Sequence, residues 1–137
     1  MQNLSLYDQA SEAAQFIAAR TALRPAIAVV LGSGLGGFAS QIENPVVLPY
    51  SEIPHFPQST APGHSGRLLV GMLNKIPIAV MQGRVHGYEG YAANQIAFPT
   101  RVLGRFGIRT LVLTNAAAVS AQRLTKASLF SSPITSI

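Results

Sequence analysis

Apolar residues in this chain recur at helical spacing in two segments. Residues 4–21 place apolar side chains about three to four positions apart, with Asp8 and Glu12 towards the front, which predicts an N-terminal helix. Residues 93–106 show the same spacing, which predicts a second helix. Pro99 lies inside that segment and is expected to kink the helix or to mark its first turn.

Other apolar segments are short and rich in β-branched residues, which is typical of buried strands. Such runs span residues 27–31 and begin again at Thr110, while residues 67–73 and 76–83 read as two strands joined across Asn74 and Lys75, as in a hairpin. Residues 44–66 contain five prolines, so we expect an extended surface segment with one short edge strand near Val46. Strands that alternate with helices predict an α/β sheet with both faces covered.

Composition narrows the class of protein. The chain has 137 residues, of which 48% are hydrophobic and 11% charged, as expected for one folded domain. Its net charge is +5, but the basic residues are scattered singly, which argues against nucleic-acid binding. The absence of cysteine excludes disulfides and thiolate metal sites. Since the chain shows neither a secretory signal nor an apolar run of membrane-spanning length, we expect a cytoplasmic protein.

Polar and glycine-rich stretches follow three of the predicted strands. "GSG" comes after residues 27–31, "GRVHGYEGY" after the apolar run of residues 76–80, and "TNAA" after the strand that begins at Thr110. Ligands of open α/β sheets bind outside the carboxyl ends of the strands. We therefore expect the three loops to face one binding site.

The glycine-rich stretch from Gly32 to Gly37 has three interpretations. It matches G-x-G-x-x-G, but a dinucleotide site also needs an acid about 20 residues further on, and the candidate, Glu52, lies in a proline-rich segment. A tight turn without a ligand is the second interpretation. The third is a phosphate site formed by backbone N–H groups, the Ser33 hydroxyl and the start of a following helix, and the pattern favours it.

The stretch after residue 82 contains a second candidate site. Arg84 and His86 are two residues apart, so in an extended backbone both side chains project to one side and together suit an oxyanion. Glu89 can accept the other ring N–H of His86 and select its tautomer. The alternative is that Arg84 pairs with Glu89 on the surface and His86 caps the next helix. From these residues alone, both interpretations stay open.

The other two histidines lie in separate segments. His64 belongs to "PGHSG", where an ordinary loop histidine is the simpler interpretation, and His55 is interpreted as structural. Three dispersed histidines without cysteine or an acidic cluster argue against a metal site.

Taken together, residues 5–117 resemble the trimeric purine nucleoside phosphorylases that cleave inosine and guanosine. The resemblance rests on four segments in the family's order: "VVLGSGLGGFA", "YSEIPHFPQSTAPGHSGRLLVG", "GRVHGYEGY" and "LVLTNAA". Methylthioadenosine phosphorylases share the fold and are the nearest alternative, although "GRVHGYEGY" is more similar to the nucleoside enzymes. The resemblance implies a phosphorylase-like mixed sheet flanked by helices, incomplete at its C-terminal side.

The resemblance also implies roles for individual residues. The catalytic residues would be His86 and Glu89, with Glu89 orienting His86, and Tyr88 would lie against the ribose. Phosphate would be bound by Ser33, His64, Arg84, His86 and the backbone N–H of Ala116. In such enzymes phosphate attacks the anomeric carbon of a sugar that is losing its purine, without a metal or organic cofactor. The implied partners are a purine nucleoside, phosphate and, in the full-length enzyme, two further subunits of a homotrimer.

Residues 118–137 depart from the family pattern. The expected glycine pair is absent, as are the residues that bind the purine, and the segment has no acids. One choice of codons for residues 131–137, read in a shifted frame, encodes Ile-Thr-Asp-His-Ile-Asn, which resembles a family segment, so we hypothesise a frameshift. Residues 1–117 are then the N-terminal part of one phosphorylase domain, and residues 118–137 are foreign to the fold. We expect no catalysis by this chain alone, and a phosphate- or nucleotide-binding module without catalysis is the second functional hypothesis.

Overall fold

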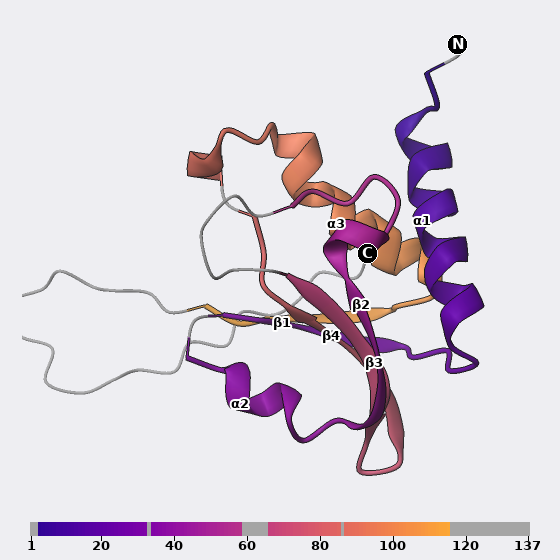
Figure 1. The fold of residues 1–137 in the computed structure, drawn as a ribbon, viewed down its shortest axis with the longest axis vertical. Helices are drawn as coiled ribbons and strands as arrows, with labels where there is room; N and C mark the ends of the chain where they lie inside the picture. The colour runs from indigo at the N-terminus through magenta and orange to yellow at the C-terminus, as the bar shows by residue number, and fades with distance from the viewer. Residues whose placement is uncertain (1–2, 33, 59–65, 86, 116–137) are drawn as a thin grey trace, which may run out of the picture.

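A five-stranded mixed sheet with helices on both faces forms the protein (Figure 1). The computed structural model describes residues 3–32, 34–58, 66–85 and 87–115. The elements follow one another as α1 (Leu6–Arg20), β1 (Ile27–Leu31), α2 (Gly36–Ala39), β2 (Glu43–Pro49), β3 (Arg67–Leu73), β4 (Ile76–Gln82), α3 (Ala93–Phe106) and β5 (Thr110–Leu113), with short 3-10 helices at Tyr50–Glu52 and Gly87–Glu89.

The strands are ordered β2-β3-β4-β1-β5 across the sheet. β1 lies between β4 and β5 and pairs with both in parallel, so that Ile27 is opposite Ile78 on one side and Thr110 on the other. β3 pairs antiparallel with β2 and with β4. The predicted α/β sheet is confirmed, and so is the edge strand expected near Val46, which is β2.

The hairpin between β3 and β4 confirms the sequence prediction. Asn74 and Lys75 both have positive φ angles, of 47° and 68°. Two successive left-handed residues are characteristic of the tight turn that matches the twist of paired strands. The residues on either side, Leu73 and Ile76, are paired.

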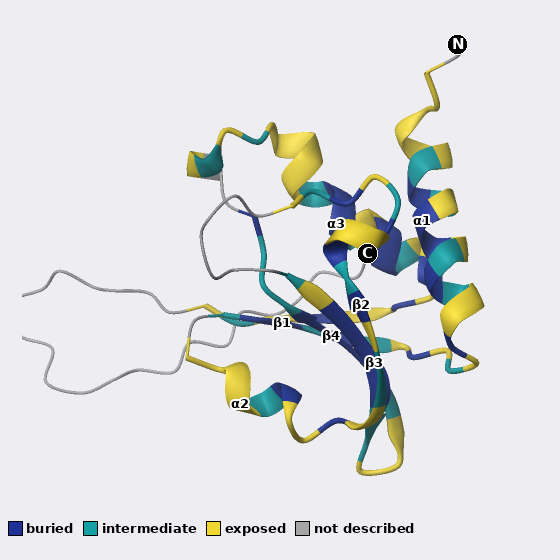
Figure 2. Ribbon diagram, viewed as in Figure 1, coloured by how far each residue is buried: buried dark blue, intermediate teal, exposed yellow. Residues whose placement is uncertain are grey.

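The two faces of the sheet are covered very differently (Figure 2). α1 and α3 pack on one face, where Ile17, Leu103 and Val70 are almost completely buried within the larger hydrophobic core. The other face carries the one-turn helix α2, and a smaller cluster of buried residues there includes Ala39 and Val80. Burial of apolar area on the α1–α3 face therefore supplies most of the stabilisation.

Helix α3 confirms the helix predicted at residues 93–106 and excludes one of the two alternatives for Pro99. The helix runs from Ala93 to Phe106 through Pro99, which is its seventh residue, so the expectation that Pro99 marks the first turn is wrong. Pro99 is buried, and packing of its ring offsets the backbone hydrogen bond that proline cannot donate. Gly107 ends the helix with a φ of 114°, a left-handed conformation that glycine adopts readily.

Neither α1 nor any other helix among the described residues combines the length and the apolar character that crossing a membrane requires.

Candidate functional site

The carboxyl ends of three strands meet at one edge of the sheet. β1, β4 and β5 are parallel neighbours, so their last residues, Leu31, Gln82 and Leu113, lie at the same edge (Figure 1). The loops that follow these strands therefore begin side by side, as the sequence predicts. A ligand bound at this edge is within reach of several loops at once.

A threonine joins the beginnings of two of these loops. The backbone N–H of Gly32, directly after β1, donates to Thr114 Oγ1 over 2.7 Å, and the Thr114 hydroxyl donates to the Val30 carbonyl over 2.7 Å. A Cβ atom at Gly32 would lie 3.1 Å from the Thr114 carbonyl oxygen, so glycine suits this close approach. The role of Thr114 was not predicted from the sequence, where its only signal was a hydroxyl residue directly after a strand.

The helix expected after the glycine-rich turn is a single turn long. α2 contains four residues, and no described side chain caps its N-terminus at Leu35. Because the helix dipole comes from the alignment of many peptide units, a single turn adds little to anion binding. The dinucleotide interpretation also loses support, since Glu52 lies in a 3-10 helix rather than at the end of a second parallel strand.

A cavity of about 140 Å³ opens at the same edge of the sheet. Among the described residues most of its lining is apolar, and Arg84, two residues beyond β4, is the charged one. These described lining residues are Val30, Tyr50, Pro57, Met81, Arg84, Val85, Ile96, Pro99, Thr100 and Leu113. Arg84 is partly buried. A guanidinium in a mostly apolar pocket attracts an anion more strongly than one in open solvent, because water screens it less.

Tyr50 supports the loop that carries Arg84. Its hydroxyl donates to the carbonyl of Gly83 over 2.7 Å, and Gly83 has a φ of 103°. Burial raises the pKa of Tyr50, so the phenol stays protonated and remains a donor. Tyr50 was not among the residues predicted from the sequence, where it appeared only as part of the matching segment "YSEIPHFP".

Few of the predicted site residues fall in the described part of the chain. Arg84 lines the cavity, Glu89 is partly buried in the 3-10 helix Gly87–Glu89, and Tyr88 in the same helix is 84% exposed. The other predicted residues, Ser33, His64, His86 and Ala116, lie outside the described residues, as does the predicted tail of residues 118–137.

His55, interpreted from the sequence as structural, connects two helices to the segment after β2. Its Nε2 lies 2.8 Å from a carboxylate oxygen of Glu12 on α1. Its ring meets that of Phe98 on α3 edge to face, with 6.5 Å between the ring centres. These contacts give His55 a packing role.

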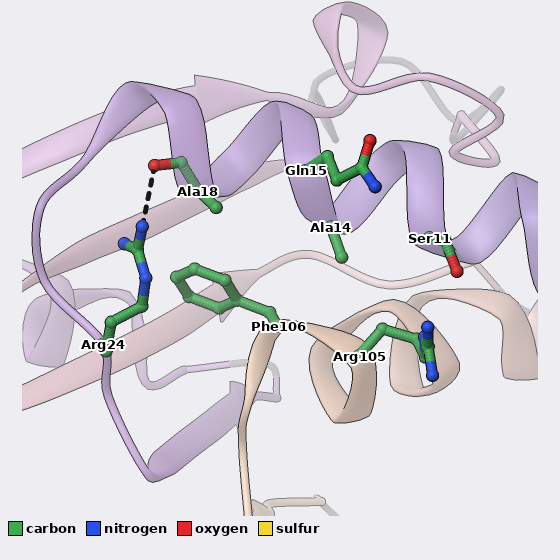
Figure 3. A pocket seen from close by; sticks show the side chains of 7 residues that line it. All are labelled: Ser11, Ala14, Gln15, Ala18, Arg24, Arg105 and Phe106. Carbon is green, nitrogen blue, oxygen red and sulfur yellow. Dashed lines mark hydrogen bonds between the residues drawn. The ribbon is translucent and has the colours of Figure 1, made fainter.

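A second cavity, of about 260 Å³, lies between α1 and α3 (Figure 3). Arg24 and Arg105 line it, but the Arg24 guanidinium already donates to the carbonyls of Thr21, Leu23 and Ala18, at 2.7, 2.8 and 3.2 Å. The Arg105 guanidinium lies 4.2 Å from the centre of the Tyr7 ring. Arg24 already bonds to carbonyls near the end of α1, and Arg105 already contacts the Tyr7 ring. The strand-end cavity is therefore the better candidate site.

Comparison with known proteins gives consistent matches. A family model described as "Phosphorylase superfamily" matches residues 26–120. The chain is 46% identical over 117 residues to a purine nucleoside phosphorylase of Rattus norvegicus, covering 85% of this chain and 40% of the relative. It is 47% identical over 110 residues to purine nucleoside phosphorylase 1 of Bacillus subtilis, covering 80% and 41%.

A solved structure matches as well. Isoform 2 of purine nucleoside phosphorylase from Schistosoma mansoni, in complex with cytosine and ribose-1-phosphate, is similar with a TM-score of 0.75 and 44% identity. That match covers 80% of this chain and 38% of the other. The chain thus spans about 40% of the length of the curated relatives that it matches. Since the family model covers most of the sequence and the fold agrees, this chain belongs to the phosphorylase superfamily.

Proposed function

We propose that this chain carries the phosphate-binding part of a purine-nucleoside phosphorylase. Such an enzyme cleaves the N-glycosidic bond of (deoxy)inosine or (deoxy)guanosine with inorganic phosphate, releasing the free purine base and (deoxy)ribose 1-phosphate for purine salvage. The identity of 46% to the Rattus norvegicus enzyme supports this reaction class. The match to a solved relative that holds ribose-1-phosphate supports the same substrate chemistry.

One observation carries the proposal. Arg84 lines a cavity at the edge where β1, β4 and β5 end, and its guanidinium can form two parallel hydrogen bonds to one phosphate. The loops after the three strands can supply further donors around the same anion. A ligand held there is oriented by rigid strands, which favours a defined angle of attack.

The proposed division of roles follows the family resemblance. Phosphate is held by Ser33, His64, Arg84, His86 and the backbone N–H of Ala116, and Tyr88 lies against the ribose. Glu89 orients His86. Phosphate then attacks the anomeric carbon while the purine leaves, and the phosphate dianion stabilises the positive charge that develops on the sugar. The proposal requires no metal or organic cofactor, and it places the full-length enzyme in the cytoplasm as a homotrimer.

The 137-residue chain by itself is proposed to bind phosphate without turning over nucleosides. It spans about 40% of its relatives, and the resemblance places the purine-binding residues outside its matched segments. Residues 1–117 are proposed as part of one domain and residues 118–137 as foreign to it. The partial coverage also favours the second candidate function, a phosphate-binding module without catalysis.

Two assays on the purified chain test this. We expect phosphate to bind with a dissociation constant on the order of 1 mM, equivalent to about 4 kcal/mol, and to bind more weakly to Arg84→Gln. We expect no release of hypoxanthine from inosine above the rate without protein. Turnover of inosine would show that the chain is catalytically complete, whereas absence of phosphate binding would contradict the proposed site.

A further inference from the structure

Tyr50 lies between two chain segments that approach the strand-end cavity from different directions. Its backbone N–H donates to the Gly66 carbonyl over 3.0 Å, directly before β3. Its hydroxyl donates to the Gly83 carbonyl over 2.7 Å, directly after β4. One residue therefore bonds to both segments.

Glycine is required where these segments meet Tyr50. A Cβ atom at Gly66 would lie 2.1 Å from two carbons of the Tyr50 ring, which leaves no space for any side chain. A Cβ at Gly83 would lie 3.1 Å from the Gly66 Cα, and the φ of 103° at Gly83 disfavours other residues there. The two segments therefore approach each other closely at Gly66 and Gly83, and Gly66 lies directly against the Tyr50 ring.

The Tyr50 ring is itself held firmly. It is 4% exposed, and it packs on Phe56 with 5.2 Å between the ring centres; Phe56 in turn meets Phe98 of α3 edge to face. Aromatic pairs of this kind restrict ring movement. The hydroxyl is thus a fixed donor.

The Gly83 carbonyl and the Arg84 N–H belong to the same planar peptide unit. A donor that fixes the carbonyl also fixes the direction of the Arg84 N–H and the position of its Cα. Tyr50 and Arg84 line the same cavity, so the hydrogen bond acts at the wall of the candidate site.

From these contacts we infer that Tyr50 is a positioning residue, whose hydroxyl holds the Gly83–Arg84 peptide in the orientation that directs Arg84 towards bound phosphate. The inference rests on the proposed function because phosphate is taken as the ligand. The geometry of the Gly83–Arg84 peptide does not depend on that function. Tyr50 does not contact phosphate in this account and acts through Arg84.

The test uses Tyr50→Phe in the full 137-residue chain, with Tyr7→Phe as the matched control. Tyr7 loses the same hydroxyl but lies 62% exposed on α1. We expect Tyr50→Phe to bind inorganic phosphate about fivefold more weakly, as for loss of one hydrogen bond, and Tyr7→Phe to bind it normally. We also expect a lower NMR order parameter for the Arg84 amide in Tyr50→Phe, while those of Val70 and Val80 stay unchanged.

The two readouts separate the possible failures. Unchanged phosphate affinity together with an unchanged Arg84 order parameter would overturn the inference, and so would an equal loss of order at Arg84, Val70 and Val80, which indicates a general structural role. If the wild-type chain binds no phosphate, the proposed function fails, and the Arg84 order parameter still decides whether Tyr50 positions the peptide.

A measurement on the wild-type chain covers the case in which Tyr50→Phe does not fold. The Tyr50 hydroxyl proton is buried and hydrogen-bonded, so we expect it to exchange slowly with water and to give a separate resonance. That resonance should shift during phosphate titration together with the Arg84 amide. A hydroxyl resonance that stays in place while the Arg84 amide shifts would overturn the inference.

Discussion

Arginines line both the cavity between α1 and α3, here called the groove, and the cavity at the strand ends, but in different surroundings. In the groove, Arg24 donates to three carbonyls near the end of α1, of which Figure 3 shows the bond to Ala18. Arg105 lies over the Tyr7 ring. At the strand ends, Arg84 lines a mostly apolar cavity beside Tyr50 and Leu113.

The partners of each arginine, rather than charge or cavity volume, distinguish the candidate site from the groove. The groove is the larger of these two cavities and is lined by two arginines. The Arg24 guanidinium, however, already donates hydrogen bonds to carbonyls near the end of α1. These carbonyls carry the negative end of the helix dipole, which lowers the attraction for a second anion. Arg84 instead lines a mostly apolar cavity, so the two regions are predicted to respond differently to the same type of mutation.

The largest predicted difference follows from Arg84→Gln. The substitution removes the charged donor from the strand-end cavity, and we expect phosphate affinity to fall about thirtyfold, or about 2 kcal/mol, because hydrogen bonds to charged groups are the stronger ones. The free energy of unfolding should change by less than about 0.5 kcal/mol. Isothermal titration and urea unfolding measure the two effects, and a variant that binds phosphate as well as wild type would remove Arg84 from the site.

Thr114→Val tests whether the hydrogen bond between Thr114, after β5, and Gly32, after β1, stabilises the protein. Valine keeps the shape but removes the oxygen that accepts from the Gly32 N–H, so we expect a loss of about 1–2 kcal/mol in the free energy of unfolding. Phosphate affinity should also decrease, because Gly32 begins one of the three loops. Thr114→Ser, which retains the oxygen, is the control and should remain close to wild type in urea unfolding.

Arg24→Met is predicted to lower stability without changing phosphate affinity, the opposite of Arg84→Gln. Loss of the donors to Thr21, Leu23 and Ala18 should lower the free energy of unfolding by about 1 kcal/mol, while the methionine retains most of the aliphatic packing. Phosphate affinity should be unchanged. Weaker phosphate binding by this variant would indicate that the groove between α1 and α3 takes part in anion binding.

The smallest effect is expected for Arg105→Met. The contact between the Arg105 guanidinium and the Tyr7 ring is exposed, and such cation–π contacts contribute about 0.5 kcal/mol. Thermal unfolding should detect this small loss, and phosphate titration should detect no change. A stability loss several times larger would mean that Arg105 holds α1 and α3 together in a way these contacts do not explain.

The regular elements could be predicted from the sequence because their signals are local. The helix at 93–106 and the strands at 27–31, 67–73 and 76–82 follow from spacing and residue type within each segment, and Asn74 and Lys75 suit the tight turn. Of the two alternatives for Pro99, a kink or the first turn, its place inside α3 excludes the first turn, and its burial in the core helps to explain why the helix continues through it.

The residues that hold the loops of the candidate site in place, Thr114 and Tyr50, could not be predicted in the same way. Thr114 bonds to a residue 82 positions away, and Tyr50 to one 33 positions away, so neither contact leaves a local pattern. Arg84 was found because it lies in a glycine-rich stretch with several polar groups. Its roles and those of Ser33, His64, His86, Tyr88, Glu89 and Ala116 remain predictions.

The most direct test is a phosphate titration of the wild-type chain at constant ionic strength, observed by NMR at the arginine Nε–H groups. The account predicts a saturating shift of the Arg84 resonance, while the Arg24 and Arg105 resonances stay in place. Equal shifts of all three arginines, or a shift at Arg24 and Arg105 without one at Arg84, would contradict it.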